Sequence, residues 1–325
     1  MHVLMVTSEW PTAEQPQRGS FIVQQADYLR RAGIAVEVFP LRAEGDPINY
    51  VKAWRALRAA HRLEDFDLMH AQFGQSGLMA WKAGLPLVVT FRGSDVLGVI
   101  GRRGRYTARG FVLKRISRTV ARRAAAVIIV SDHLAAALPR GLTPHVIPSG
   151  LDLNLFRPMP QEEARRQLGL PLDKPLVLFG ANPAVARKRY PLAQQALQTI
   201  DAPADVEMVV LTGVARAQVP VYMNACDLLL MTSKHEGSPN VVKEALACDV
   251  PVVSVDVGDV RQRIGAVDGC ILCPDDSPEA LGAAVATVLR RKPRIRGREA
   301  VRDLDERLLT RKVIAIYQAV LDKQS

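Results

Sequence analysis

Residues 233–253 read SKHEGSPNVVKEALACDVPVV, and this stretch decides the fold because it joins two apolar strands through a turn and a helix. The segment DLLLMTS before it and the segment VPVVSV at its end are short apolar runs typical of buried strands. Ser238 is placed as an N-cap with Pro239 at the first helical position, so the helix is expected to begin at Pro239. A strand, a helix and a second strand in this order indicate parallel strands covered by helices.

The same alternation continues along the chain in both directions. Ten short runs rich in Val, Ile and Leu predict strands, and helical apolar spacing lies between most of them, as in SFIVQQADYLRRAG from Ser20 to the capping residue Gly33. The segment Ile147–Pro160 has three prolines and no clear periodicity, so we interpret it as an interdomain linker. The sequence therefore predicts an α/β fold with two doubly wound parallel sheets.

Composition narrows the class of protein. The 325 residues are 48% hydrophobic, enough for a large core, while no run approaches the roughly 20 apolar residues needed to span a bilayer. The N-terminus has no basic leader, and four cysteines are too few for a disulfide framework. We therefore expect a cytoplasmic protein with reduced thiols. The CILC motif falls inside an apparent strand, where cysteine is usually a small buried side chain.

The two glutamates of the opening stretch lie where ligands bind in parallel sheets, beyond the carboxyl end of a strand. The free amides of Asn240 and Val241 at the helix start would attract phosphate, and Glu244 in the next turn would accept hydrogen bonds from a ribose diol. Glu236 lies on the loop before the helix and could meet the other end of the same ligand. The alternative is that both glutamates are solvated surface residues.

The motif EGSPNVVKEALACDVPVV resembles the Glu-x7-Glu signature of retaining glycosyltransferase family 4. The resemblance continues in TSEWPTAEQPQRGSFIVQQADYLRRAGIAVEVF, in VIPSGLDLNLF, in YMNACDLLLMTS and in GCILCPDDSPEALGAAV. These motifs follow one another in the family's order over most of the chain. The resemblance implies a GT-B fold, with residues 1–155 as the acceptor-side domain and 156–305 as the nucleotide-sugar domain. It also implies that the helix in 306–325 packs back on the first domain.

The resemblance further implies roles for individual residues. Glu244 would bind ribose, Glu236 would contact the donor sugar, and Lys188 would neutralise the β-phosphate as a catalytic residue. The donor-binding set would be completed by Gly19, Ser238, Pro239, Asn240 and Val241. Fixed cations and amides that hold the departing diphosphate stabilise the transition state, so we expect no metal and no cofactor. The donor is expected to be a UDP-sugar, with a GDP-sugar as the alternative.

Three departures from the family pattern affect this transfer of roles. The usual phosphate-binding Arg after LVLFGAN is absent, so either Arg187 or Arg189 supplies the second cation, or the site has only one. The family's H-G-x-D element reads FRGSD here. Arg92 would therefore contact phosphate or an acidic sugar, or instead form a structural salt bridge with Asp95. The segment VARAQVPV is much shorter than its family counterpart, which leaves the nucleobase open.

A basic segment without acids suggests a surface contact. The net charge is +10, and no acidic residue falls between Asp95 and Asp132. In a helix, Val112, Leu113, Ile116 and Val120 of this segment would share one side, flanked by Arg115, Arg118 and Arg122. Such a helix would bind anionic lipid, or would simply be a solvated face. Few aromatics and no binding motif argue against nucleic acid.

The sequence thus predicts an enzyme that adds a sugar from a nucleotide-sugar to a saccharide or lipid-linked acceptor in bacterial cell-surface polysaccharide synthesis, peripheral to the inner membrane face. A nucleotide-sugar 2-epimerase and a non-catalytic GT-B scaffold protein are the alternatives. His70 and His235 are further candidates for lining the cleft, with Asp95, and a structural role is the other interpretation of His70.

Overall fold

The computed structural model describes residues 1–42, 47–80, 83–101, 105–201, 205–293 and 295–323. The chain divides into two compact units. The first contains Met1–Ile100, Arg105–Gly150 and Glu306–Ser325, and the second is formed by Leu151–Asp305. The chain passes from the first unit to the second within the predicted linker.

The first unit is built on a six-stranded sheet with the order β2-β1-β3-β4-β5-β6, in which every neighbouring pair is parallel. Its strands are β1 His2–Thr7, β2 Ala35–Pro40, β3 Leu68–Gln72, β4 Leu87–Phe91, β5 Ala126–Ile129 and β6 His145–Val146. The order reverses after β2, because the chain then crosses over β1 to place β3 on the other side. The loops after β1 and β3 therefore leave the sheet at a topological switch point, where α/β proteins bind ligands.

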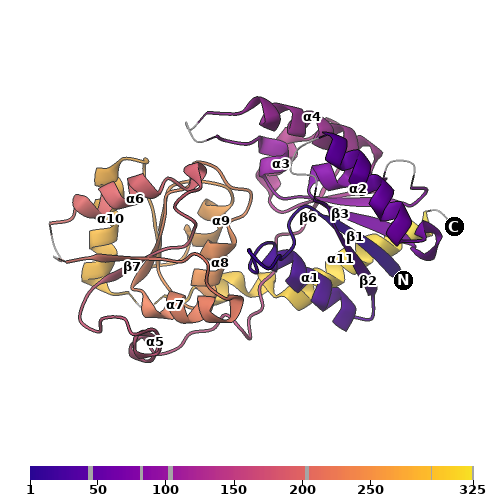
Figure 1. Ribbon diagram of the computed structural model, residues 1–325. Helices are drawn as coiled ribbons and strands as arrows, with labels where there is room; N and C mark the ends of the chain where they lie inside the picture. The colour runs from indigo at the N-terminus through magenta and orange to yellow at the C-terminus, as the bar shows by residue number, and fades with distance from the viewer. Residues whose placement is uncertain (43–46, 81–82, 102–104, 202–204, 294, 324–325) are drawn as a thin grey trace. The chain divides into compact units, whose positions relative to one another are not determined.

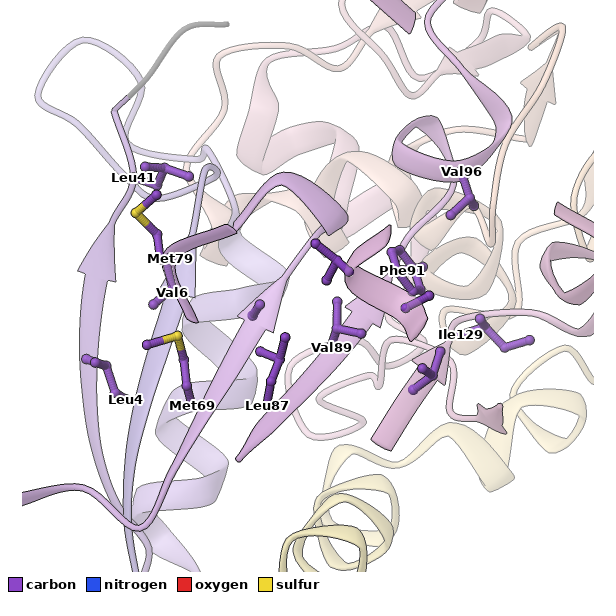
Figure 2. Close-up of a cluster of buried hydrophobic side chains, with 14 of the residues drawn as sticks. Leu4, Val6, Leu41, Met69, Met79, Leu87, Val89, Phe91, Val96 and Ile129 are labelled. Atoms are coloured by element: carbon purple, nitrogen blue, oxygen red, sulfur yellow. The ribbon is translucent and has the colours of Figure 1, made fainter. Parts of the chain in front are cut away.

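Helices cover both faces of this sheet (Figure 1). They are α1 Ser20–Arg31, α2 Pro47–Ala60, α3 Ser94–Leu97, α4 Ala108–Arg123 and α11 Glu306–Asp322, with 3-10 turns η1 Leu63–Asp65, η2 Gly74–Ala80 and η3 Asp132–Ala137. Because side chains alternate along a strand, Leu4 and Val6 point to the same face of the sheet, into a buried hydrophobic cluster (Figure 2). The same cluster includes Leu57 of α2 and Val120 of α4. The helices α1 and α11 pack together on the opposite face.

The C-terminal helix α11 is joined to the first unit by a buried polar contact. Tyr317 and His70 are both 0% exposed, and the Tyr317 hydroxyl lies 2.6 Å from His70 Nδ1. Thr90 Oγ1 lies 2.8 Å from the other ring nitrogen of His70. A buried imidazole is costly unless its nitrogens are paired, so this contact fixes where α11 crosses the sheet.

The second unit contains a five-stranded parallel sheet with the order β11-β10-β9-β7-β8. Its strands are β7 Leu176–Phe179, β8 Glu207–Val210, β9 Leu228–Met231, β10 Val252–Ser254 and β11 Ile271–Leu272. The helices are α5 Gln161–Leu168, α6 Tyr190–Gln198, α7 Val219–Ala225, α8 Asn240–Ala247, α9 Val260–Ile264 and α10 Pro278–Arg291, with η4 Ala186–Lys188, η5 Arg216–Gln218 and η6 Glu299–Leu304. The helices α6 and α10 pack together over one face, and α7 and α8 cover the other (Figure 1).

The ten predicted strands are confirmed, as is the predicted fold class of two doubly wound parallel sheets. The short edge strand β6 was not predicted, since its two residues carry no periodic pattern. Helix α1 ends before Gly33, whose φ of 85° is the left-handed cap conformation expected there. The segment that carries the predicted basic helix is helical, as α4; Val112 is 55% exposed, and the helix buries Ser117, Val120 and Ala121.

His70 makes the stability of the first unit sensitive to acid. Burial lowers the pKa of His70 from 6.5 to about 3, so the unfolded chain binds a proton across this window while the folded chain does not. Stability is therefore fully present above pH 6.5 and is lost as the pH falls towards 3. We expect wild type to lose about 2 kcal/mol more than His70→Gln between pH 6.5 and pH 4.5, measured by urea unfolding. The exposed control His145→Gln should behave as wild type, and equal pH profiles for all three proteins would contradict the assignment.

Candidate functional site

The site predicted around Glu236 forms at the switch point of the second sheet. β7 leads to β8 on one side, whereas β9 lies on the other side of β7, so the loops after β7 and β9 diverge from neighbouring carboxyl ends. Arg187 and Lys188 lie on the loop after β7, in η4. Glu236 lies on the loop after β9, before α8. Residues 48 or more positions apart in sequence are thereby brought together.

One carboxylate oxygen of Glu236 accepts hydrogen bonds from two cations. Lys188 Nζ lies 2.6 Å from Oε1, and Arg187 Nη1 donates to the same oxygen. The Glu236 and Lys188 side chains are only 11% and 17% exposed. The cluster therefore has two positive charges and one negative charge in a partly desolvated place at the end of a parallel sheet. Such an excess of fixed positive charge suits an anion such as a diphosphate.

The ionisation states in this cluster follow from burial and charge together. Burial alone would raise the pKa of Glu236, but Lys188 and then Arg187 more than offset this, and the pKa lies below its ordinary value. Burial lowers the pKa of Lys188, partly opposed by Glu236. His235 beside them has its pKa lowered first by burial and then by Arg187. Glu236 is therefore ionised at neutral pH.

Hydrogen bonds to backbone carbonyls hold the two loops together. Thr232 Oγ1 donates to the Lys188 carbonyl at 2.8 Å, and the Lys234 amide donates to the Arg187 carbonyl at 2.8 Å. Arg189, the other candidate for the second cation, points elsewhere. Its Nε donates to the Thr232 carbonyl at 2.6 Å, and its guanidinium pairs with Asp276. Arg187 is therefore the cation that accompanies Lys188.

The predicted start of the following helix is wrong by one residue. α8 begins at Asn240 with Pro239 as its N-cap, and no side chain caps it. Ser238 does not cap the helix because its hydroxyl donates to Asp259 Oδ2 at 2.8 Å, a residue 21 positions away. The amides of Asn240 and Val241 in the first turn consequently have no side-chain cap, which leaves this helix end suited to an anion.

Glu244 has a partner that sequence reasoning missed. Arg216 Nη1 lies 2.5 Å from Glu244 Oε1, and the Glu244 side chain is 7% exposed. The Arg216 guanidinium also lies 4.5 Å from the ring centroid of buried Phe156. Arg216 is the one basic residue of the shortened segment VARAQVPV. This basic residue was the only feature of the sequence that could have indicated the contact, because Glu244 lies 28 residues further along the chain.

Gly19 belongs to the first unit, at the N-cap of α1. Its φ of 66° is left-handed, and a Cβ there would meet the Glu9 carbonyl oxygen at 2.3 Å. Both facts require glycine. The predicted donor contact of Gly19 stays a prediction.

The predicted salt bridge between Arg92 and Asp95 is wrong. Asp95 is 0% exposed and accepts from the backbone amides of Gly74 and Gly93 at 3.1 and 2.9 Å, and from the amide of Arg92. The Arg92 guanidinium instead donates to neutral oxygens: Gln72 Oε1 at 2.6 Å, Ser149 Oγ at 2.7 Å and Gln25 Oε1 at 3.2 Å. Burial lowers the pKa of Arg92 to about 10, opposed by Glu306 and Asp95, so it remains charged at neutral pH.

His70 and Asp95 do not line a cleft as predicted, because both side chains are fully buried. Burial raises the pKa of Asp95, although hydrogen bonds from four backbone amides, its own included, act in the opposite direction. Each residue is used inside the first unit, His70 to hold α11 and Asp95 to order the turn after β4. His235 is partly exposed and lies beside Glu236, where a cleft-lining role stays a prediction.

Within the described residues, no group of three His, Cys, Asp or Glu side chains is arranged to hold a metal ion. The cysteines of CILC are thiols, and burial raises the pKa of both Cys270 and Cys273 to about 11. No helix in the described part of the chain is both long and apolar enough to cross a membrane.

Two doubly wound parallel sheets, together with glycosyltransferases of the same fold among the solved structures, give the chain the GT-B fold. A family model described as a glycosyl transferase 4-like domain matches residues 1–150. A second, described as glycosyl transferases group 1, matches residues 165–291. Together the two models cover most of the chain, which is a glycosyltransferase similar to family 4.

Similar proteins agree in class. A Bacillus subtilis protein named as a teichuronic acid biosynthesis glycosyltransferase, TuaC, is 28% identical over 88% of each chain. A D-inositol 3-phosphate glycosyltransferase of Xylanimonas cellulosilytica is 28% identical over 72% of this chain and 68% of its own. Among solved structures, sucrose-phosphate synthase from Thermosynechococcus elongatus has a TM-score of 0.77 at 19% identity, covering 99% of this chain and all of its own. Anabaena HepE in complex with UDP-glucose has a TM-score of 0.68 at 19% identity, covering 100% of this chain and 99% of its own.

A double-mutant cycle tests the coupling of Arg216 and Glu244. Arg216→Met leaves a buried carboxylate without its cation, whereas Glu244→Gln removes the charge that needs one, so the two losses of unfolding free energy should not add. We expect a coupling energy of about 1–3 kcal/mol from urea unfolding of wild type, both single variants and the double variant. A coupling below about 0.3 kcal/mol would show that the contact contributes nothing in solution.

Proposed function

We propose that the protein transfers a sugar, with retention of configuration and without a metal, from a nucleotide-sugar donor to a saccharide acceptor. The observation that carries this proposal is the cluster at the second switch point, where Lys188 and Arg187 converge on one oxygen of Glu236. Two fixed cations beside an uncapped helix start form a site suited to a diphosphate. Glu244, in the second turn of that helix, is assigned to the ribose hydroxyls.

The cluster accounts for the part of the chemistry that needs stabilisation. When the bond between the sugar and the diphosphate breaks, negative charge develops on the leaving phosphate, and positioned cations lower the energy of that state. Lys188 and Arg187 supply this charge in the proposal. Glu236 holds the two cations in place before the donor binds. Once the donor is bound, Glu236 contacts the donor sugar in this proposal. The acceptor hydroxyl gives its proton to the leaving phosphate, without a protein nucleophile.

Relatives support the donor class. The structural neighbour HepE was crystallised with UDP-glucose, and a Mycolicibacterium smegmatis relative, 28% identical over 80% of this chain, is named a GDP-mannose-dependent α-mannosyltransferase. We favour a UDP-sugar, with a GDP-sugar as the alternative. The name of the Bacillus relative points to cell-surface polysaccharide, and we assign the acceptor to a lipid-linked saccharide of that kind.

The surface of α4 supports a place on an anionic membrane. Phe111 is 62% exposed and Val112 is 55% exposed, and Arg115, Arg118 and Arg122 on the same helix are exposed too. The Arg115 guanidinium lies 5.9 Å from the Phe111 ring centroid. Exposed aromatic and basic side chains on one helix are typical of interfacial binding. Arg102 and Arg103 of the same basic segment lie outside the described residues.

Nucleotide binding tests the transferase assignment. At about 100 times its dissociation constant, the right nucleotide should raise the unfolding free energy by roughly 2.7 kcal/mol, which is a readable shift of the thermal midpoint. We expect one of UDP, GDP, ADP and dTDP to produce it, and we expect Glu244→Ala and Lys188→Met each to lose most of it. The control Glu163→Ala removes an exposed glutamate of the same unit and should keep the full shift.

Two results would contradict the transferase assignment. If no nucleotide or nucleotide-sugar shifts the midpoint of well-folded wild type, the transferase assignment falls and the scaffold alternative gains. If UDP-N-acetylglucosamine is converted without any acceptor, the epimerase alternative replaces it.

Liposome sedimentation tests the membrane assignment. Changing Arg115, Arg118 and Arg122 together to Glu should weaken binding to anionic vesicles at least tenfold at low salt, because each basic residue contributes about 1 kcal/mol near such a surface. The matched control changes Arg290, Arg291 and Lys292, three exposed basic residues at the end of α10, to Glu. Wild type that ignores anionic vesicles, or equal losses in both variants, would rule out α4 as the contact.

A further inference from the structure

The first unit contains a cavity of about 500 Å³ that is separate from the Glu236 cluster. Its lining comes from the loops after β1, β2 and β3, together with the starts of α2 and α4, and includes Trp10, Arg18, Tyr50, Gln75 and Arg109. The first sheet reverses its order between β1 and β3. The cavity therefore lies at this sheet's own switch point and has the size of a small-molecule site.

The walls combine aromatic and polar groups. Trp10 and Tyr50 offer rings that are neither fully buried nor fully exposed. Gln75 donates through Nε2 to Ser8 Oγ at 2.9 Å, and its amide oxygen has no hydrogen-bond partner among the described residues. A small rotation of Gln75 towards a ligand hydroxyl would therefore gain a bond for that oxygen. Aromatic faces and side-chain amides together suit a sugar ring with its hydroxyls.

The charged side chains of the cavity differ in whether they are paired within the protein. Arg18 is used by the protein, since its Nε lies 2.9 Å from Glu9 Oε2 and its Nη2 donates to the Ser8 carbonyl. Glu14 is partly balanced by Arg42: its own backbone amide and Thr12 lower the pKa of Glu14, and Arg42 lowers it further. By contrast, Arg109 makes no hydrogen bond or ion pair with any residue in the described part of the chain.

Arg109 also stands at the wrong end of its helix. It is the second residue of α4, whose first turn has no acidic residue, and Thr107 caps the start by accepting from the Gly110 amide at 3.0 Å. A helix start carries a partial positive charge, so a cation there lowers stability. Its positive field reaches Tyr50, because burial raises the pKa of Tyr50 while Arg109 acts to lower it. A cation in this locally unfavourable position, within a cavity of ligand size, is typical of a functional residue.

We propose that this cavity binds a saccharide that carries an anionic group, a sugar carboxylate or phosphate, through the guanidinium of Arg109. Guanidinium groups pair with both anions through two parallel hydrogen bonds, and the adjacent helix start adds to the positive potential. Trp10 and Tyr50 pack against the sugar ring. That this saccharide is the acceptor rests on the transferase function proposed above. Its binding to the cavity does not depend on that function.

Titration calorimetry on the full chain, without nucleotide and at 150 mM salt, tests the binding. The probes are methyl β-D-glucuronide, methyl β-D-glucoside 6-phosphate and neutral methyl β-D-glucoside. We expect wild type to bind at least one anionic probe ten times more tightly than the neutral one or better, and the stronger of the two identifies carboxylate or phosphate. Arg109→Gln should abolish this preference, whereas Trp10→Ala should weaken all probes alike.

The matched control is Arg55→Gln, which removes an exposed arginine of α2 that does not line the cavity. It should keep the full preference. Arg109→Gln removes a cation from a helix start, so it should be at least as stable as wild type, and failure to fold is not expected to confuse the result. Equal affinities for charged and neutral probes in wild type, no binding of any probe, or an unchanged preference in Arg109→Gln would each overturn the proposal.

Failure of this proposal and failure of the transferase function are distinguishable. Arg109→Gln should keep the nucleotide-dependent thermal shift, because the Glu236 cluster belongs to the other unit. A nucleotide shift without anionic preference would leave a transferase with a different acceptor. Anionic preference without any nucleotide shift would leave a saccharide-binding cavity in a protein of another function.

Discussion

The shared oxygen of Glu236 is the contact on which the candidate site depends. Lys188 and Arg187 lie on one loop, and without a carboxylate between them two cations in a partly desolvated place would repel each other. Glu236 removes that repulsion and fixes both side chains from the opposite loop. The arrangement is preformed, which matters because a transition state is stabilised most by groups that need no reorganisation at the moment of reaction. An arriving diphosphate would meet cations that are already ordered.

Both sheets place their chemistry by the same topological rule. In each, the chain lays down a first strand, adds a neighbour on one side and then crosses to the other, so two loops diverge where the order reverses. In the second unit these loops carry the Glu236 cluster, and in the first they form much of the cavity beside Trp10. The buried contact between His70 and Tyr317 serves the same end indirectly. It commits the chain's last helix to the first sheet, so this unit is completed by residues from both ends of the sequence.

Sequence reasoning succeeded where the signal is local. The strands and the end of α1 follow from apolar runs and a glycine cap. It failed where a side chain chooses a distant partner. Ser238 has the right position for an N-cap, but Asp259 takes its hydroxyl and the helix starts later. A salt bridge from the Arg92 guanidinium to Asp95 was one of two alternatives, but backbone amides pair with Asp95 instead. The contact of Arg216 with Glu244 joins residues 28 positions apart, and the cavity of the first unit is lined by separate loops. No short stretch of sequence therefore contains either feature.

Arg92 is another residue whose partners differ from those that the family pattern suggests. In the family pattern the position belongs to a histidine, and an arginine there suggested a contact with phosphate or an acidic sugar. In the structure its guanidinium instead spreads over Gln72, Gln25 and Ser149 and lies 4.6 Å from the Phe21 ring centroid. Because these partners are neutral, they use the donors of Arg92 without forming an ion pair. Ser149 lies in the predicted linker, next to Gly150, where the chain leaves the first unit. The geometry therefore makes Arg92 a link between Gln72 of β3, Gln25 of α1 and the segment where the chain leaves the first unit.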